Sequence, residues 1–99
     1  MRVEVRPLYL NGRSVPKQIR DRDAARTGDL TIVENRNESL GRLVTVARLV
    51  GHADSTDLSL LPDLTDVHIV WLAAKTMRLR GNELVDNVWY AQTWEVRVL

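Results

Sequence analysis

The sequence predicts a mainly β protein: a small antiparallel barrel or sandwich that ends in a β-meander and contains at most one short helix. Two observations lead to this fold class. Apolar and polar residues alternate along several short segments, which is the pattern of half-buried strands. Turn signals at Ala74-Lys75 and Asp86-Asn87 separate the last three of these segments, as in a meander. With 99 residues, 44% of them apolar, we expect one domain over residues 1–99.

The first strand is expected over residues 2–10. Val3 and Val5 alternate with charged side chains there, and the turn signal Asn11-Gly12 follows. Pro7 lacks an N–H donor, so we expect this strand to lie at a sheet edge or to contain a bulge.

We expect the one short helix within the charged segment 14–26. Ser14 could cap this helix, and Pro16 suits its first turn. A loop fits equally well, because so few apolar residues would leave an isolated helix marginal. Its basic residues could hold phosphates or could form a solvated surface. These residues are Arg13, Lys17, Arg20, Arg22 and Arg26.

Two strands are expected over residues 30–34 and 42–50, joined by the polar turn 35–39. The second segment also fits the apolar stripe of a helix. We favour a strand because Val44, Thr45 and Val46 are β-branched.

Residues 51–66 are expected to form a long connection that packs on the core through Leu58, Leu60 and Leu61. The only hints of a metal site in the sequence are His52, Asp54, Asp57 and His68. They lack the His-Glu-x-x-His pattern and the helical spacing that zinc sites use. We therefore predict no metal ion.

The register of the last two strands follows from the turn at Asp86-Asn87, because a two-residue loop determines which residues of a hairpin lie opposite each other. One face is expected to be the core face. Its pairs are Val85 with Val88, Glu83 with Tyr90, Gly81 with Gln92, Leu79 with Trp94, and Met77 with Val96. The other face meets water or a partner. Its pairs are Leu84 with Trp89, Asn82 with Ala91, Arg80 with Thr93, Arg78 with Glu95, and Thr76 with Arg97.

The turn at Ala74-Lys75 places residues 67–73 beside the middle strand of the meander. It predicts Leu72 opposite Met77 and Val70 opposite Leu79, which agrees with the same core face. On the outer face, Trp71 would then lie beside Arg78, and Ile69 beside Arg80.

Composition excludes several classes of function. The chain has no Cys, which removes thiolate catalysis, iron–sulfur clusters and Cys-ligated zinc. It has 14 basic and 13 acidic residues, so no overall field attracts nucleic acid or membranes. No apolar run reaches the roughly 18 residues of a membrane span, and the charged N-terminus does not resemble a signal peptide. We expect a soluble cytoplasmic protein without a membrane partner.

The sequence contains no pattern of catalytic residues. A Gly-x-Ser-x-Gly elbow is absent, and the five Gly are scattered singly, so no phosphate-binding loop can be written. We therefore predict a protein that is not an enzyme and needs no cofactor.

The candidate binding surface is the outer face of the meander. Trp and Arg are enriched at binding hot spots, and here they could form cation–π and Arg–carboxylate contacts. The candidate residues are Trp71, Arg78, Arg80, Trp89 and Glu95. Alternatively, this face could form a second core or be covered by a second copy in a homodimer.

The stretches Val70–Leu72, Met77–Val85 and Tyr90–Trp94 resemble the ends of small uncharacterised proteins of proteobacterial phages and mobile elements. The resemblance covers the last third of the chain and implies context only. Our first hypothesis is a protein-binding module, such as a phage-type accessory factor, host-defence inhibitor or virion component. The alternatives are a small nucleic-acid-binding barrel, in which Trp71 and Trp89 stack bases, and a small metal-dependent enzyme.

Overall fold

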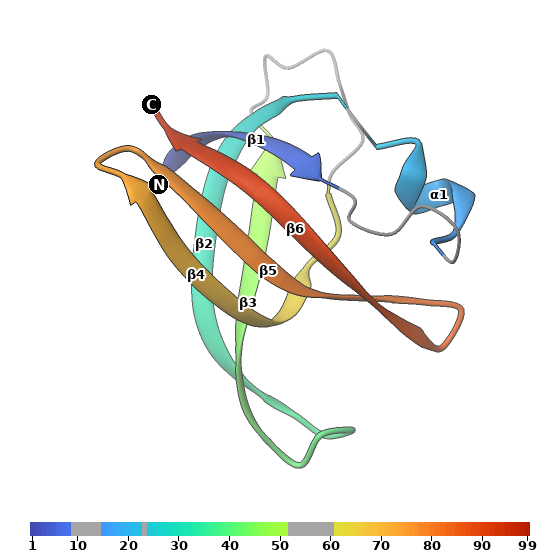
Figure 1. The fold of residues 1–99 in the computed structure, drawn as a ribbon. Helices are drawn as coiled ribbons and strands as arrows, with labels where there is room; N and C mark the ends of the chain where they lie inside the picture. Colours follow the sequence, from blue (N-terminus) through green and yellow to red (C-terminus); the bar gives the residue numbers. More distant parts are fainter. Residues whose placement is uncertain (9–14, 23, 52–60) are drawn as a thin grey trace.

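A computed structural model describes residues 1–8, 15–22, 24–51 and 61–99 (Figure 1). In order, its elements are β1 (Arg2–Leu8), α1 (Lys17–Arg20), β2 (Arg26–Asn37), β3 (Arg42–Gly51), β4 (Leu64–Ala73), β5 (Thr76–Val85) and β6 (Val88–Val98). Neighbouring strands are antiparallel, and β1 pairs with β6 to close the ring. The mainly β prediction is confirmed, and the architecture is a barrel. No helix of the described ranges is long and apolar enough to cross a membrane.

The β5–β6 hairpin has the predicted register. Asp86 and Asn87 form its turn with positive φ angles of 49° and 64°, the backbone that a tight hairpin turn requires. All pairs from Val85 with Val88 to Thr76 with Arg97 occur as expected. The predicted core face is buried along most of its length, including Met77, Leu79, Glu83, Gln92, Trp94 and Val96.

The N-terminal half is also close to expectation. Residues 42–51 form a strand and not a helix, and with β2 they make a hairpin longer than predicted. Beyond Val5, β1 pairs with β6 but no longer with β2, so among the described residues Pro7 has a strand neighbour on one side only. A residue without an N–H donor is tolerated at such a position.

The predicted register between β4 and β5 is wrong by one residue. The turn itself is as expected, because Ala73 pairs with Thr76. A register shift between Trp71 and Ala73 then brings Trp71 opposite Met77 and Val70 opposite Arg78. A bulge inserts one residue and exchanges the two faces of a strand. Trp71 and Ile69 therefore lie on the side of the core, and Val70 and His68 lie outside.

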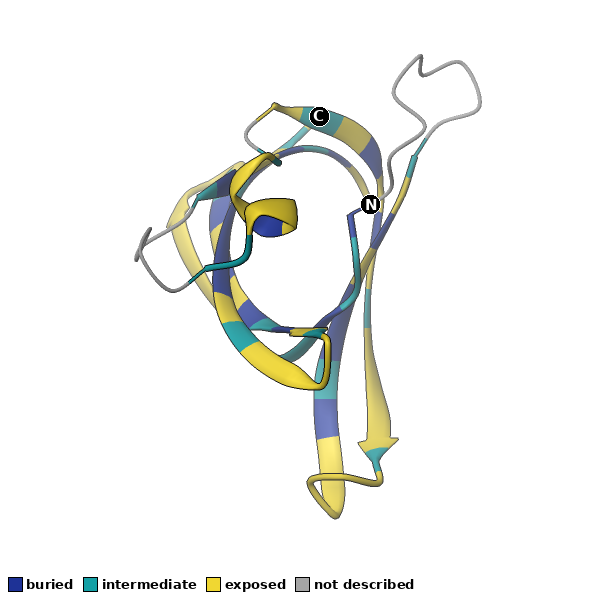
Figure 2. Cartoon of the chain, turned by 90° about the vertical axis from the view of Figure 1, so that its right-hand side faces the viewer, coloured by how far each residue is buried: buried dark blue, intermediate teal, exposed yellow. Residues whose placement is uncertain are grey.

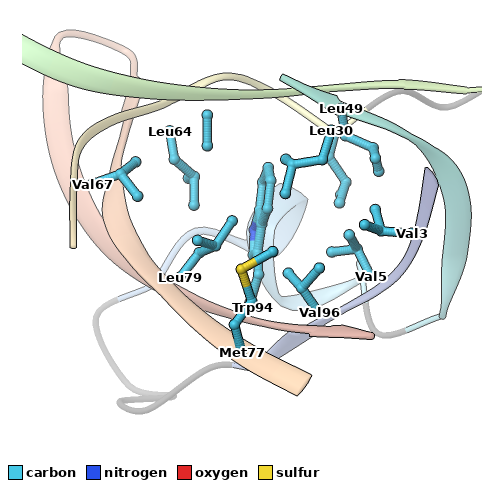
Figure 3. Packing of buried hydrophobic residues seen from close by; sticks show 12 residues of the cluster. Val3, Val5, Leu30, Leu49, Leu64, Val67, Met77, Leu79, Trp94 and Val96 are labelled. Carbon is cyan, nitrogen blue, oxygen red and sulfur yellow. The ribbon is translucent and has the colours of Figure 1, made fainter. Parts of the chain in front are cut away.

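The core fills the barrel around Trp94, which is fully buried (Figure 3). Aliphatic side chains from all six strands surround it, including Val3, Leu30, Leu49, Leu64 and Leu79. The indole Nε1 has no hydrogen-bond partner within the described part of the chain, and the ring is held there by packing against the aliphatic side chains. Leu61 is buried in the same cluster, whereas Leu58 and Leu60 lie outside the described residues.

The short helix α1 lies at one mouth of the barrel (Figure 2), and its Ile19 is fully buried. The helix occupies only part of the predicted segment 14–26, and Pro16 is its N-cap residue. Ser14, the predicted cap, lies outside the described residues.

A sharp change of direction in β4 shapes the neighbouring wall of the barrel. β3 and β4 share only two pairs, Val46 with Thr65 and Ala47 with Leu64. Asp66 then takes a φ of 58°, and a register shift separates Thr65 from His68. Gly81 of β5 lies against this bend: a Cβ there would be 2.9 Å from both Leu64 Cβ and Val67 Cγ2.

Gly81→Ala should therefore destabilise the barrel by about 2 kcal/mol, because the added methyl overpacks the bend. Urea unfolding followed by circular dichroism measures the change. Adding Val67→Ala should restore part of the lost stability, since it removes one of the crowded atoms. Equal stability of Gly81→Ala and the wild type would show that the bend has room to spare.

Candidate binding surface on the barrel wall

Four of the five predicted binding residues lie on the outer wall. Arg78, Arg80 and Glu95 are outside because their strand neighbours Met77, Leu79 and Trp94 point into the core. Trp89 lies outside at the end of the β5–β6 hairpin, opposite Leu84. Trp71 is on the other side of the sheet, opposite Met77.

The structure does not bring the two tryptophans together. Their partners on β5, Met77 and Leu84, are seven positions apart in the strand. At about 3.3 Å per residue, this separation is roughly 23 Å. Trp71 and Trp89 are 54% and 39% exposed, so neither fills a second core in the isolated chain.

The sequence prediction missed Val70 and Leu72, which take the place expected for Trp71. With Leu8, His68, Arg78 and Arg80 they line a groove of about 420 Å³ on the outer wall, and Thr93 forms part of its base. Val70 and Leu72 are more than half exposed. The surface therefore combines an apolar floor with two guanidinium groups.

The two arginines of this groove have no ion-pair partner among the described residues. Glu95 lies directly opposite Arg78 in the register, but the two side chains form no ion pair. Among the residues that the structure describes, no carboxylate is within ion-pair distance of Arg78 or Arg80. Two exposed, uncompensated positive charges beside apolar side chains favour an acidic, partly apolar ligand.

No protein-family model matches this chain. No curated protein and no solved structure is similar to it either. The candidate site therefore rests on the geometry and chemistry of the wall.

A buried polar cluster joins the segment after α1 to β5 and β6. Arg22 Nη1 donates to Glu83 Oε1 at 2.7 Å, and Gln92 Nε2 donates to Glu83 Oε2. The Glu83 side chain is only 5% exposed and that of Arg22 is 24% exposed. Arg22 thus has a structural role, and it ties the segment after α1 to the inner wall. Arg13, another member of the predicted basic group, lies outside the described residues.

Arg22→Ala should cost about 2–4 kcal/mol, because it leaves the buried Glu83 carboxylate without its cation. Arg20→Ala is the matched control: Arg20 is exposed on α1, and its loss should change stability by less than about 0.5 kcal/mol. Thermal unfolding of both variants checks the prediction, and similar losses in the two would remove the special role of Arg22.

Asp66 is held at the β4 bend by a two-point contact with Arg42. Arg42 Nη2 donates to Oδ2 at 2.8 Å, and Nη1 donates to Oδ1 at 3.4 Å. The hydrogen bonds from Arg42 lower the pKa of Asp66, and the charges of Arg42 and His68 add to this effect against a smaller opposing effect of burial. The contact links the turn end of the β2–β3 hairpin, where Arg42 pairs with Asn37, to the bend.

Asp66→Asn should reduce stability near neutral pH but not in acid. The pKa of the Asp66 carboxyl is lower in the folded chain than its value of about 3.9 in an unfolded chain. The carboxylate therefore contributes stability above that value, and the contribution is lost as the pH falls through the folded pKa. Unfolding curves of the two proteins should differ at about pH 7 and converge by about pH 2. A constant difference across this range would contradict the assignment.

The described residues contain no cluster of three or more potential metal ligands. His68 is exposed on β4 and lines the groove. The other residues of the metal hypothesis, His52, Asp54 and Asp57, lie outside the described residues.

Proposed function

We propose that this protein is a non-enzymatic binding module for another protein, and that the groove on the outer face of β4 and β5 holds the partner. One observation carries the proposal: an apolar floor formed by Val70 and Leu72 lies beside Arg78 and Arg80, which have no carboxylate partner in the described part of the chain. An apolar centre with arginine at its border is typical of protein interfaces.

The groove favours an acidic, partly apolar segment of the partner. Carboxylates would pair with Arg78 and Arg80, and apolar side chains would cover Val70 and Leu72. A nucleic-acid strand is less well matched, because Trp71 and Trp89 lie too far apart to stack neighbouring bases. We further propose a cytoplasmic setting, and the role of a phage-type accessory factor, host-defence inhibitor or virion component.

Photo-crosslinking tests the groove directly. A photoreactive amino acid at Leu8, which lines the groove on β1, should crosslink a distinct protein in cells that produce the chain. The same amino acid at Leu43, which is 61% exposed on the β2–β3 hairpin, is the control and should not.

The double variant Arg78→Glu/Arg80→Glu should reduce the Leu8 crosslink by at least about tenfold, because it reverses both charges at the groove. Arg36→Glu, at an exposed site on the hairpin, should leave the crosslink unchanged. Equal crosslinking at Leu8 and Leu43, or a product that contains nucleic acid instead of protein, would overturn the proposal.

A further inference from the structure

The second half of β4 is an open strand edge. From His68 to Ala73 this strand pairs with β5, while its pairing with β3 ends at Thr65. On the β3 side, no strand of the described residues pairs with this stretch. Within the described part of the chain, its backbone therefore has unpaired N–H and C=O groups on this side, which can template the addition of another strand.

This edge lacks the usual protection against pairing with another chain. Residues 69–73, Ile-Val-Trp-Leu-Ala, contain neither a charged residue nor proline. Ile69, Val70, Trp71 and Leu72 are 37%, 58%, 54% and 51% exposed. Because Ile69 and Trp71 are on one face and Val70 and Leu72 on the other, both faces of the edge are apolar.

We propose that two copies of this chain associate through their β4 edges, which pair antiparallel across a two-fold axis. Residues directly opposite each other in an antiparallel pair share a face of the sheet. The two-fold axis must then pass between one residue and the same residue of the second copy. That residue is either Val70 or Trp71. With Val70 on the axis, Ile69 of each copy lies opposite Trp71 of the other, and the contact is apolar on both faces.

Charge favours a second copy as the occupant of this edge. The chain has a net charge of only +1, so the two copies repel each other weakly. In the continuous sheet of the dimer, the two β4 strands lie between the two β5 strands, which carry Arg78 and Arg80. The β5 backbones are then about 14 Å apart, which exceeds the Debye length of about 8 Å at physiological salt. A strand of another protein would need apolar side chains on both of its faces to match this edge. A second copy of β4 already has such side chains on both faces.

Mass measurement with one charge substitution tests the dimer. Sedimentation equilibrium of the wild type should show twice the chain mass of 11.3 kDa, falling to the chain mass on dilution. Val70→Lys should weaken the dimer at least about 100-fold, because it places two ammonium groups opposite each other at the axis. Val50→Lys is the matched control: Val50 is 49% exposed on β3 but is paired with β2, and its substitution should leave the dimer intact.

Tryptophan quenching locates the interface. Acrylamide should quench Trp71 less in the dimer than in the monomer, and Trp71→Phe should abolish that concentration dependence. A wild type that stays at the chain mass at all concentrations would overturn the proposal and leave the edge to a foreign strand. A dimer that survives Val70→Lys, or one in which Trp71 stays equally quenched, would also overturn it. The Leu8 crosslink detects a foreign protein, whereas sedimentation detects a second copy, so failure of one proposal is distinguishable from failure of the other.

Discussion

After Thr65 the backbone of β4 turns away from β3, and the open edge of β4 depends on this bend. Asp66 makes the turn at a φ of 58°, a backbone region that Asp tolerates better than most residues because its short side chain can hydrogen-bond locally. Arg42 holds the carboxylate from the β2–β3 hairpin, and Gly81 allows β5 to follow the bend closely. The ring stays closed through two β3–β4 pairs only. A straight β4 would continue along β3, and its apolar residues would have no open edge.

The two ends of β5 and β6 are stabilised in different ways. Near Met77 and Trp94 the interior is apolar and fully buried, so the hydrophobic effect and close packing stabilise it. Near the hairpin the interior is polar, and a paired carboxylate, Glu83, lies beneath α1 with Arg22 and Gln92. A buried carboxylate is tolerated only with such partners. The polar end depends on Arg22, which follows α1, whereas the apolar end depends on packing alone.

Local turn chemistry explains which parts of the fold were predictable. Asp86-Asn87 determines the β5–β6 register, and every pair of that hairpin was correct. The Ala74-Lys75 turn was also correct, but one bulge beyond it moved Trp71 away from Arg78 and brought Val70 there. A bulge depends on packing and strand twist across the sheet, which no short sequence pattern records. The pairing of β1 with β6 and the bend of β4 likewise depend on contacts distant in sequence. Arg78, Arg80 and Glu95 were therefore placed correctly, while the groove was not foreseen.

Amide hydrogen exchange along β4 tests the account most directly. In protein dilute enough to be monomeric, the amide of Thr65, which has strand neighbours on both sides, should be protected. Between His68 and Leu72, amides that point to β5 should be protected and the alternate ones should exchange rapidly, because they face the open edge. That alternation would establish the bend and the free edge together. Uniform protection of residues 68–72 in the monomer would show that the chain covers this edge itself, and would contradict the account.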